Sequence, residues 1–222
     1  KQPLQRAAPR HLTEQQLNFF DVFGYLSLPG MFADEIDKIS AHFDMLFQSR
    51  SDEVIDWVHE THENRLRRVI TEATQKDAYL ASLLNDERIT GPAISILGDD
   101  YVFTGSDASI YDCGTTFHQD GINTAKPKSI NIKMALYLEA IDGASGALRV
   151  IPGSHHTGDK FFGKLTKSWM AEEFLRMRTE DVPATIVSSK PGDLLLWDYR
   201  LMHATAYGGN RRRMLALEFA EQ

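Results

Sequence analysis

The sequence of 222 residues predicts a mainly β fold, an antiparallel sandwich or jelly roll with helices packed on one face. Three observations lead to this class. The first half of the chain carries apolar residues at helical spacing. Residues 129–138 then alternate strictly between two rows of side chains, as a strand with one buried face does. Further short apolar runs follow, separated by Gly, Pro, Asn and Asp residues typical of turns.

The N-terminal part is predicted to be mostly helical after a loose polar arm at 1–10. Thr13 and Gln16 have the spacing of a capping box, so a helix is expected to begin there and to end at Gly24. A short strand, a turn and further helices follow. They are expected at Tyr25–Leu28 (strand), Pro29-Gly30 (turn), and 34–47, 72–86 and 89–97 (helices).

The C-terminal part is predicted to form strands, of which 129–138 is the strongest. Its apolar row consists of Ile130, Ile132, Met134, Leu136 and Leu138, and its other row of Ser129, Asn131, Lys133, Ala135 and Tyr137. Further strands are expected at 147–151, 185–188, 194–197 and 214–219. A polar insert at 157–182, with a short helix at about 168–178, interrupts this series.

Length and composition indicate a single cytoplasmic domain spanning 1–222, with a helical part at 1–98 packed on a core at 99–222. Cys113 is the only cysteine, which excludes an intramolecular disulfide and suits a reducing compartment. No apolar run approaches the roughly 20 residues that cross a bilayer, so no membrane partner is expected. The net charge of −7 argues against nucleic acid. The oligomeric state is not predicted.

Three side chains form a candidate metal site. His118 and Asp120 are separated by one residue, so on a strand they project from the same face. His203, at the end of a distant predicted strand, supplies a third ligand. Two imidazoles and one carboxylate on one face are the set that suits non-haem Fe(II), leaving open positions for a co-substrate and O2. The short motif alone is common, and the features further along the chain make it specific.

Arg212 is the candidate anchor for a co-substrate. When a diacid such as 2-oxoglutarate chelates iron through its 2-oxo-acid end, its far carboxylate lies in a dry pocket, where a guanidinium can clasp it bidentately. Alternation in the strand that follows places Arg212 and Arg213 on opposite sides. The row of Arg213 is more apolar and is expected to pack against the helical layer. This favours Arg212, and Arg213 stays the alternative.

Other polar side chains are candidates for contacts in the site. Lys133 and Tyr137 share one row of the strongest strand. That row is either a solvated face or the interior face, where both side chains would contact 2-oxoglutarate or substrate. Thr115 precedes the first metal ligand by three residues and is a candidate hydrogen-bond partner of the co-substrate. The weakly patterned stretch 51–72 is predicted to be a substrate lid.

A series of short motifs runs in order along nearly the whole chain. It consists of Leu12-Thr13-x-x-Gln16, Phe20-x-x-x-Gly24-Tyr25, Leu28-Pro29-Gly30, Leu97-Gly98, His118-Gln119-Asp120, Gly146-Ala147-Leu148-x-x-Ile151-Pro152-Gly153-Ser154-His155, Pro191-Gly192-Asp193, His203 and Arg212. Each motif alone is loose, but the ordered series is specific. The sequence thereby resembles the phytanoyl-CoA dioxygenase family of Fe(II)/2-oxoglutarate oxygenases.

The resemblance implies a double-stranded β-helix core, that is, a cupin-like jelly roll. It implies that iron is bound by His118, Asp120 and His203. It further implies that Arg212 binds 2-oxoglutarate and that the Thr205 hydroxyl helps to hold the same carboxylate. Related halogenases have Gly or Ala in place of Asp120, so the resemblance implies hydroxylation or another oxidation over chlorination.

We therefore expect an Fe(II)- and 2-oxoglutarate-dependent dioxygenase that uses O2, hydroxylates an unactivated C–H bond of a small-molecule substrate, and releases succinate and CO2. Two alternatives come from other classes. One is a cupin-like module that binds or senses without catalysis, which 2-oxoglutarate-dependent succinate release would exclude. The other is a hydrolase or isomerase that uses Zn(II) or Mn(II), which would be active without O2. The identity of the substrate is not predicted, because one fold hosts many functions.

Overall fold

The computed structural model describes residues 11–58, 66–120, 129–156, 179–207 and 211–222. Its helices are α1 (Glu14–Phe23), α2 (Ile36–Ser49), α3 (Ala73–Lys76), α4 (Ala78–Ser82) and α5 (Glu87–Leu97), with 3₁₀ turns η1 (Ser51–Glu53), η3 (Leu83–Asn85), η4 (Ser154–His156) and η6 (Thr179–Asp181). None of the helices among these residues is long and apolar enough to cross a bilayer.

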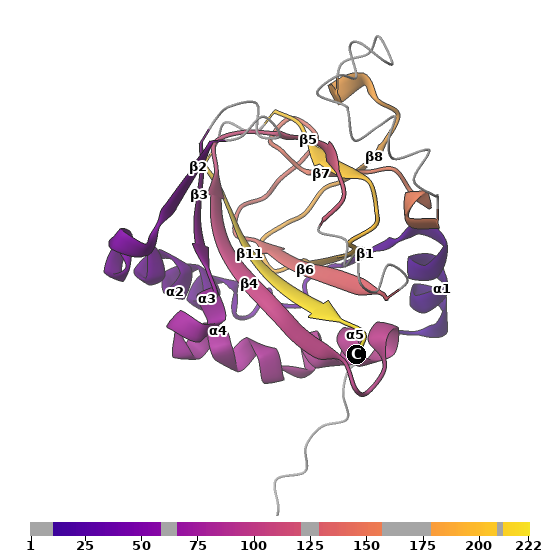
Figure 1. Ribbon diagram of the computed structural model, residues 1–222, viewed down its shortest axis with the longest axis horizontal. Coiled ribbons are helices and arrows are strands. Elements are labelled where there is room, and N and C mark those ends of the chain that lie inside the picture. Colours follow the sequence, from indigo (N-terminus) through magenta and orange to yellow (C-terminus); the bar gives the residue numbers. More distant parts are fainter. Residues whose placement is uncertain (1–10, 59–65, 121–128, 157–178, 208–210) are drawn as a thin grey trace, which may run out of the picture.

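The described strands form two antiparallel sheets. Their bounds are β1 (Tyr25–Leu28), β2 (Ile55–Val58), β3 (Leu66–Thr71), β4 (Val102–Tyr111), β5 (Thr115–His118), β6 (Asn131–Tyr137), β7 (Leu148–Val150), β8 (Thr185–Val187), β9 (Leu194–Asp198), β10 (His203–Thr205) and β11 (Arg212–Ala220). The large sheet has the order β1-β9-β6-β11-β4-β3-β2, and the small sheet the order β5-β10-β7-β8. The two sheets face each other (Figure 1). This is the jelly roll that the sequence predicted.

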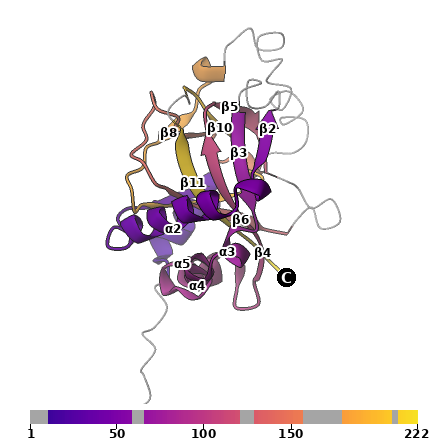
Figure 2. The ribbon, with the colours of Figure 1, turned by 90° about the vertical axis from the view of Figure 1, so that its left-hand side faces the viewer.

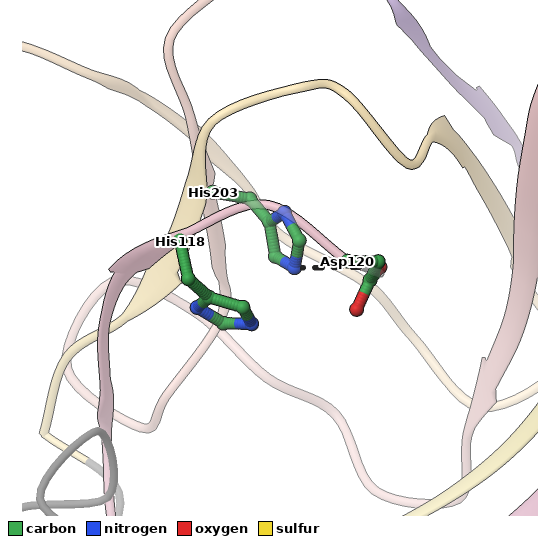
Figure 3. Close-up of side chains that lie close together, drawn as sticks. All are labelled: His118, Asp120 and His203. Atoms are coloured by element: carbon green, nitrogen blue, oxygen red, sulfur yellow. Dashed lines mark ion pairs between the residues drawn. The ribbon is translucent and has the colours of Figure 1, made fainter. Parts of the chain in front are cut away.

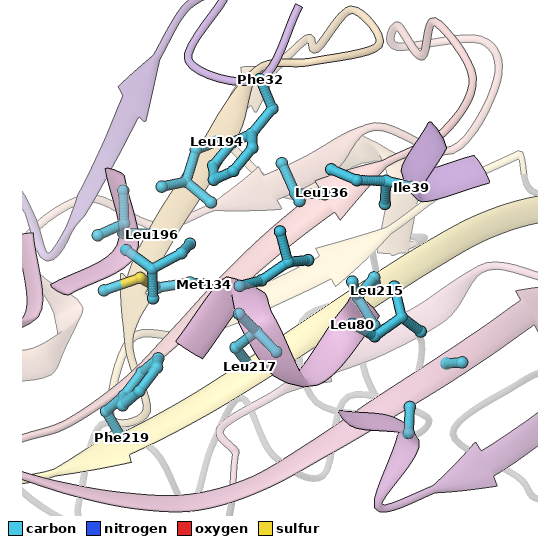
Figure 4. Packing of buried hydrophobic residues seen from close by; sticks show 14 of the residues in the cluster. Phe32, Ile39, Leu80, Met134, Leu136, Leu194, Leu196, Leu215, Leu217 and Phe219 are labelled. Atoms are coloured by element: carbon cyan, nitrogen blue, oxygen red, sulfur yellow. The ribbon is translucent and has the colours of Figure 1, made fainter. Parts of the chain in front are cut away.

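Helices cover the outer face of the large sheet (Figures 1 and 2). The apolar row of β6, exemplified by Met134 and Leu136, packs there with Leu215 and Leu217 of β11 and with Ile39 of α2 (Figure 4). All of these side chains are at most 2% exposed. The predicted apolar row of 129–138 therefore does face the helical layer, as does the row of Arg213.

The inner face of the large sheet looks toward the small sheet. A second apolar cluster forms between them, in which Tyr137 and Trp197 of the large sheet pack with Leu148 and Val150 of the small sheet. The row of Lys133 and Tyr137 is thus the interior row, not a solvated face. This inner space is where the polar candidates of the sequence gather.

The helix predicted to begin at Thr13 is confirmed. The Thr13 hydroxyl accepts from the Gln16 backbone N–H, the Gln16 side chain accepts in return from the Thr13 N–H, and the helix ends at Gly24 in a left-handed conformation with φ of 79°. The stretch 72–86 is divided into shorter helical pieces, because Asp77 caps α4 by accepting from the N–H groups of Tyr79 and Leu80.

The described residues of the stretch 51–72, which was predicted to be a substrate lid, belong mainly to the large sheet. They form β2 and β3, which extend the large sheet beside β4 at its edge. Arg67 and Arg68 obscured the strand pattern of β3, and the small polar residues of β4 (Val102–Tyr111) hid that strand entirely. The large sheet takes β1, β2 and β3 from the first 98 residues. Most of the predicted insert, including its helix, and residues 59–65 of the predicted lid lie outside the described residues.

Candidate functional site

His118 and His203 lie opposite each other on neighbouring strands of the small sheet. His118 is the last residue of β5 and His203 the first of β10, and the two are paired in the register of the sheet. Their ring centroids are 4.3 Å apart. The sequence predicted that strand alternation would place Asp120 on the same face as His118. Instead, Asp120 comes two residues after β5 ends, and the local path of the chain brings its carboxylate to the side of His118.

Possible ligand atoms of these three residues lie within 4.8 Å of one another, the only such group of three among the described residues (Figure 3). His203 Nε2 is 3.6 Å from Asp120 Oδ2. The Nδ1 atoms of the two histidines are bonded to backbone carbonyl groups. His118 Nδ1 donates to the Thr116 carbonyl at 2.8 Å and His203 Nδ1 to the Leu201 carbonyl at 2.9 Å. Because a carbonyl only accepts, each Nδ1 carries the proton and each Nε2 offers its lone pair.

The surroundings of His203 and Asp120 favour the protonation states in which these side chains bind metal. Burial, together with the nearby His118, lowers the pKa of His203 from 6.5 to about 4, so its imidazole is neutral at pH 7. Burial alone would raise the pKa of Asp120, but the Lys133 ammonium, which also hydrogen-bonds to this carboxylate, holds that pKa well below its usual range. Two imidazole Nε2 atoms and one carboxylate form a donor set that fits a divalent metal such as Fe(II).

A cavity of about 230 Å³ opens at this group. It is lined by every site residue named from the sequence, which are Thr115, His118, Asp120, Lys133, Tyr137, His203, Thr205 and Arg212. The side chains come from both sheets, and residues almost a hundred positions apart meet here. Tyr137 is 2% exposed, and burial raises the pKa of its hydroxyl to about 12, so the hydroxyl remains protonated.

Arg212 lines the cavity and is 1% exposed. Its Nη2 donates to the Cys113 carbonyl at 3.2 Å and to the Thr205 hydroxyl at 3.3 Å. Its Nε and Nη1 are buried and have no hydrogen-bond acceptor among the described residues. Thr115 supports Thr205, since its hydroxyl is 3.2 Å from that of Thr205. A buried guanidinium with two unused donor atoms is suited to an incoming anion.

Arg213, the alternative anchor, points to the opposite face of the sheet. It donates to both carboxylate oxygens of Asp44 in α2, at 2.7 and 2.8 Å, and its Nε donates to Glu139 at 2.6 Å. Its donors are therefore used in ion pairs on the helical side. No part of it lines the cavity.

Several cavity residues were not anticipated from the sequence. Arg67, Asp107 and Tyr111 line its side formed by β3 and β4, and Trp57 of β2, from the stretch predicted to be a lid, lines the same side. Those strands were not recognised, so no pattern brought these residues together. Trp197 lines the cavity as well and donates to Asp120. The strand predicted at 194–197 includes this residue. That Trp197 pairs with Lys133 could not be predicted, because it depends on which strands are neighbours in the sheet.

A larger hollow of about 680 Å³ lies elsewhere, along Gly30–Asp34 and Asn85–Arg88. Its guanidinium, that of Arg88, is already paired with Asp34, Glu35 and Asp86. It offers no unpaired buried cation and no metal-binding group. The smaller cavity therefore is the better candidate for chemistry.

A jelly roll whose inner cavity holds such a donor set beside a buried, half-used guanidinium has the construction of the non-haem iron oxygenases that depend on 2-oxoglutarate. Residues 20–214 match the phytanoyl-CoA dioxygenase (PhyH) family. The chain belongs to this family, and it is an Fe(II)- and 2-oxoglutarate-dependent dioxygenase. The class and the cofactors expected from the sequence are thus confirmed.

Similar proteins of known activity include the ectoine dioxygenases of Nocardia farcinica (strain IFM 10152) and Sphingopyxis alaskensis (strain DSM 13593 / LMG 18877 / RB2256). Both are 26% identical to this chain, over 222 and 220 residues. The similarity covers 86% and 87% of this chain, and 72% and 70% of the two relatives.

Two solved structures show the same fold. EctD from S. alaskensis with 2-oxoglutarate and 5-hydroxyectoine has a TM-score of 0.73 at 21% identity, covering 97% of this chain and 79% of that chain. HygX from Streptomyces hygroscopicus with nickel and 2-oxoglutarate bound has a TM-score of 0.74 at 18% identity, covering 96% of this chain and 88% of that chain.

Proposed function

We propose that His118, Asp120 and His203 bind Fe(II), and that Arg212 with the Thr205 hydroxyl binds the far carboxylate of 2-oxoglutarate. The enzyme then hydroxylates an unactivated C–H bond of a small-molecule substrate. Iron with 2-oxoglutarate and O2 supplies the oxidising power, and the co-substrate leaves as succinate and CO2. The protein's part is to hold the ligands, to neutralise the diacid and to place the substrate.

The pair of unpartnered donor atoms on Arg212 carries this proposal. Leaving two donor atoms of a buried guanidinium without acceptors is costly, and an incoming carboxylate that accepts from Nη1 or from Nε, which lie on opposite sides of the group, would remove part of this cost. Thr205 lies on the same strand as His203, two residues further on, and its hydroxyl is already within 3.3 Å of Arg212. A diacid that reaches from the imidazoles to Arg212 therefore has polar partners at both ends.

The substrate is proposed to be small and polar. The cavity of about 230 Å³ is below the roughly 300–1,000 Å³ that is usual for ligand pockets, and it also has to hold the co-substrate. The side that remains for substrate carries Trp57, Arg67, Asp107 and Tyr111, which offer aromatic faces and both signs of charge. Because relatives are ectoine dioxygenases, ectoine is the first molecule to test.

We also propose that the enzyme is cytoplasmic. A chain with one cysteine has no intramolecular disulfide, which suits a reducing compartment.

The test is a screen of small polar molecules, ectoine included, for stimulated conversion of 2-oxoglutarate to succinate with Fe(II) in air. The expected result is succinate formation that one substrate stimulates, with a product heavier by one oxygen atom. Omitting O2 and replacing Fe(II) by Zn(II) serve as controls and should abolish turnover. Turnover that persists without O2 would support a hydrolase or isomerase. Iron binding without any succinate would support a non-catalytic binding module.

A further inference from the structure

The Asp120 carboxylate is not positioned by the strand that carries His118. The two imidazoles are held by paired strands and by bonds from their Nδ1 atoms to carbonyl groups. Asp120 follows the end of β5 in an irregular stretch, where the backbone does not fix the direction of the side chain. A metal ligand in such a place needs contacts from other elements to keep its geometry.

Two donors from the large sheet supply these contacts. Lys133 Nζ lies 2.9 Å from Asp120 Oδ1, and Trp197 Nε1 donates to Asp120 Oδ2 at 2.9 Å. Lys133 in β6 and Trp197 in β9 are partners in the sheet register, so their side chains leave the inner face side by side. Asp120, next to the small sheet, is thereby tied to the large sheet by both of its oxygens.

A third strand holds the lysine. Glu218 in β11 is the register partner of Lys133 on its other side, and its Oε1 lies 3.2 Å from Lys133 Nζ. The Tyr199 hydroxyl is hydrogen-bonded to Glu218. The side chains of Lys133, Asp120 and Glu218 are 14%, 12% and 23% exposed, so the ammonium is largely withdrawn from water between two carboxylates.

A buried ion pair of this kind contributes little net stability, because desolvation cancels much of the attraction. Its value lies in geometry. Each carboxylate oxygen has two acceptor positions, so one donor per oxygen leaves a lone pair for a metal while fixing the plane of the group. Lys133 is ion-paired with Asp120 and Glu218 in this arrangement, so the co-substrate is bound by Arg212 and Thr205.

We infer that Lys133 and Trp197 are positioning residues for the iron ligand Asp120, and that Glu218 keeps Lys133 in place. The inference rests on the proposed function, since it takes Asp120 as an iron ligand. It gives Lys133 a role different from the co-substrate contact that the sequence suggested.

The experiment compares Fe(II) affinity, measured without O2, in the wild-type chain and in Lys133→Met, with the exposed Lys190→Met as the matched control. The expected loss in Lys133→Met is about 10- to 100-fold, as for other residues that orient metal ligands. Its charge-transfer absorption with 2-oxoglutarate should also shift, because that band reports the ligand field. Lys133→Arg should recover part of the affinity, and Lys190→Met should match the wild type.

Two conservative variants keep the test decisive if Lys133→Met does not fold. Trp197→Phe removes the indole N–H together with one ring of the side chain, and Glu218→Gln removes only a charge. Each should weaken Fe(II) binding while 2-oxoglutarate affinity at saturating iron stays the same. Unchanged iron affinity and absorption in these folded variants would overturn the inference. A loss of 2-oxoglutarate affinity alone would overturn it in favour of a direct contact. A wild-type chain that binds no iron would instead refute the proposed function.

Discussion

Arg212 and Arg213 are adjacent in sequence and have opposite environments. Arg213 is used in ion pairs with Asp44 and Glu139 on the helical side of β11. Arg212 is enclosed on the inner side, where its guanidinium lies 4.9 Å from the centre of the Tyr111 ring. Strand alternation alone separates the two, so a single test can compare them at nearly identical places in the chain.

Arg212→Ala should leave iron bound and weaken the binding of 2-oxoglutarate by roughly 3–5 kcal/mol, because the far carboxylate would lose its buried partner. Titration calorimetry of 2-oxoglutarate into the metal-loaded protein measures this. Arg213→Ala is the matched control and should keep the wild-type affinity. The reverse pattern, with the loss in Arg213→Ala, would transfer the anchor to that residue.

Residue types and spacing were enough to name the principal candidates for the site. His118, Asp120, His203 and Arg212 carry chemistry that few other residues share, and alternation fixed the side of Arg212. The contacts among them were beyond the sequence. That Lys133 meets Asp120, and that Trp197 donates to it, depends on β6 and β9 being neighbours, which no local pattern encodes.

Among the elements, the end of α1 is held by an unusually close approach. Gly24 closes the helix at φ of 79°, and a Cβ added there would lie 2.5 Å from His155 Nδ1. The His155 ring is fixed from its other side, where Nε2 donates to the Asp21 carbonyl at 2.9 Å. The helix end and η4 are therefore packed against each other through a glycine.

Gly24→Ala should lower the free energy of unfolding by more than the conformational cost of about 1 kcal/mol that an alanine pays at positive φ. Gly30→Ala is the control, because Gly30 also has a positive φ, of 67°, and its added Cβ would meet nothing within 4 Å. Denaturant unfolding of both variants measures the difference. Equal losses would show that the His155 contact has no energetic weight.

Asp77 links two elements, since its carboxylate caps α4 and also bonds His42 Nδ1 of α2 at 2.9 Å. Burial alone would raise the pKa of Asp77, but its hydrogen bonds to His42 and to the Leu80 and Tyr79 N–H groups lower it below 3.8. The folded state therefore favours the ionised form. The stability gained from this preference is present above the unfolded pKa of about 3.9 and is lost as pH falls through the lower folded pKa.

Asp77→Ala should accordingly cost about 1–2 kcal/mol of unfolding free energy at pH 7, and the gap to the wild type should narrow below about pH 4. Urea unfolding at a series of pH values checks this. The exposed Asp99 provides the control variant, Asp99→Ala, which should stay within about 0.5 kcal/mol of the wild type. A gap that widens in acid would contradict the sign of the shift.

The prediction of strands succeeded where one face of the strand carries an apolar row of side chains. It failed where the segment is a strand only because it pairs with neighbouring strands. The alternation of 129–138 and 214–219 identified β6 and β11, since burial on the helical side demanded it. β4 reads Val-Phe-Thr-Gly-Ser-Asp-Ala-Ser-Ile-Tyr, with little apolar periodicity. It is a strand because β11 and β3 flank it on both sides.

In the whole molecule, the core is complete without a metal. The larger apolar cluster joins the helices to the outer face of the large sheet, away from the cavity. The chain should therefore fold without iron and gain stability when iron and 2-oxoglutarate bind only the folded state.

A thermal melt in EDTA should show a cooperative transition, and Mn(II), as an inert stand-in for Fe(II), with 2-oxoglutarate should raise the Tm. At ligand concentrations near 100 times Kd the gain is about 2.7 kcal/mol, which is roughly 5–10 °C for a chain of this size. In Arg212→Ala, adding 2-oxoglutarate on top of the metal should produce little further shift. A wild-type Tm that ignores both ligands would contradict the assignment of the cavity.

The bond between Thr205 and Arg212 has a consequence for co-substrate choice. His203 and Thr205 are separated by two residues of one strand, a span of roughly 6–7 Å, and Thr205 is in contact with Arg212. The spacing between His203 and the pair of Thr205 and Arg212 therefore sets the distance between the chelating end of a diacid and its far carboxylate. Oxaloacetate, one methylene shorter, and 2-oxoadipate, one longer, should both support much slower turnover than 2-oxoglutarate.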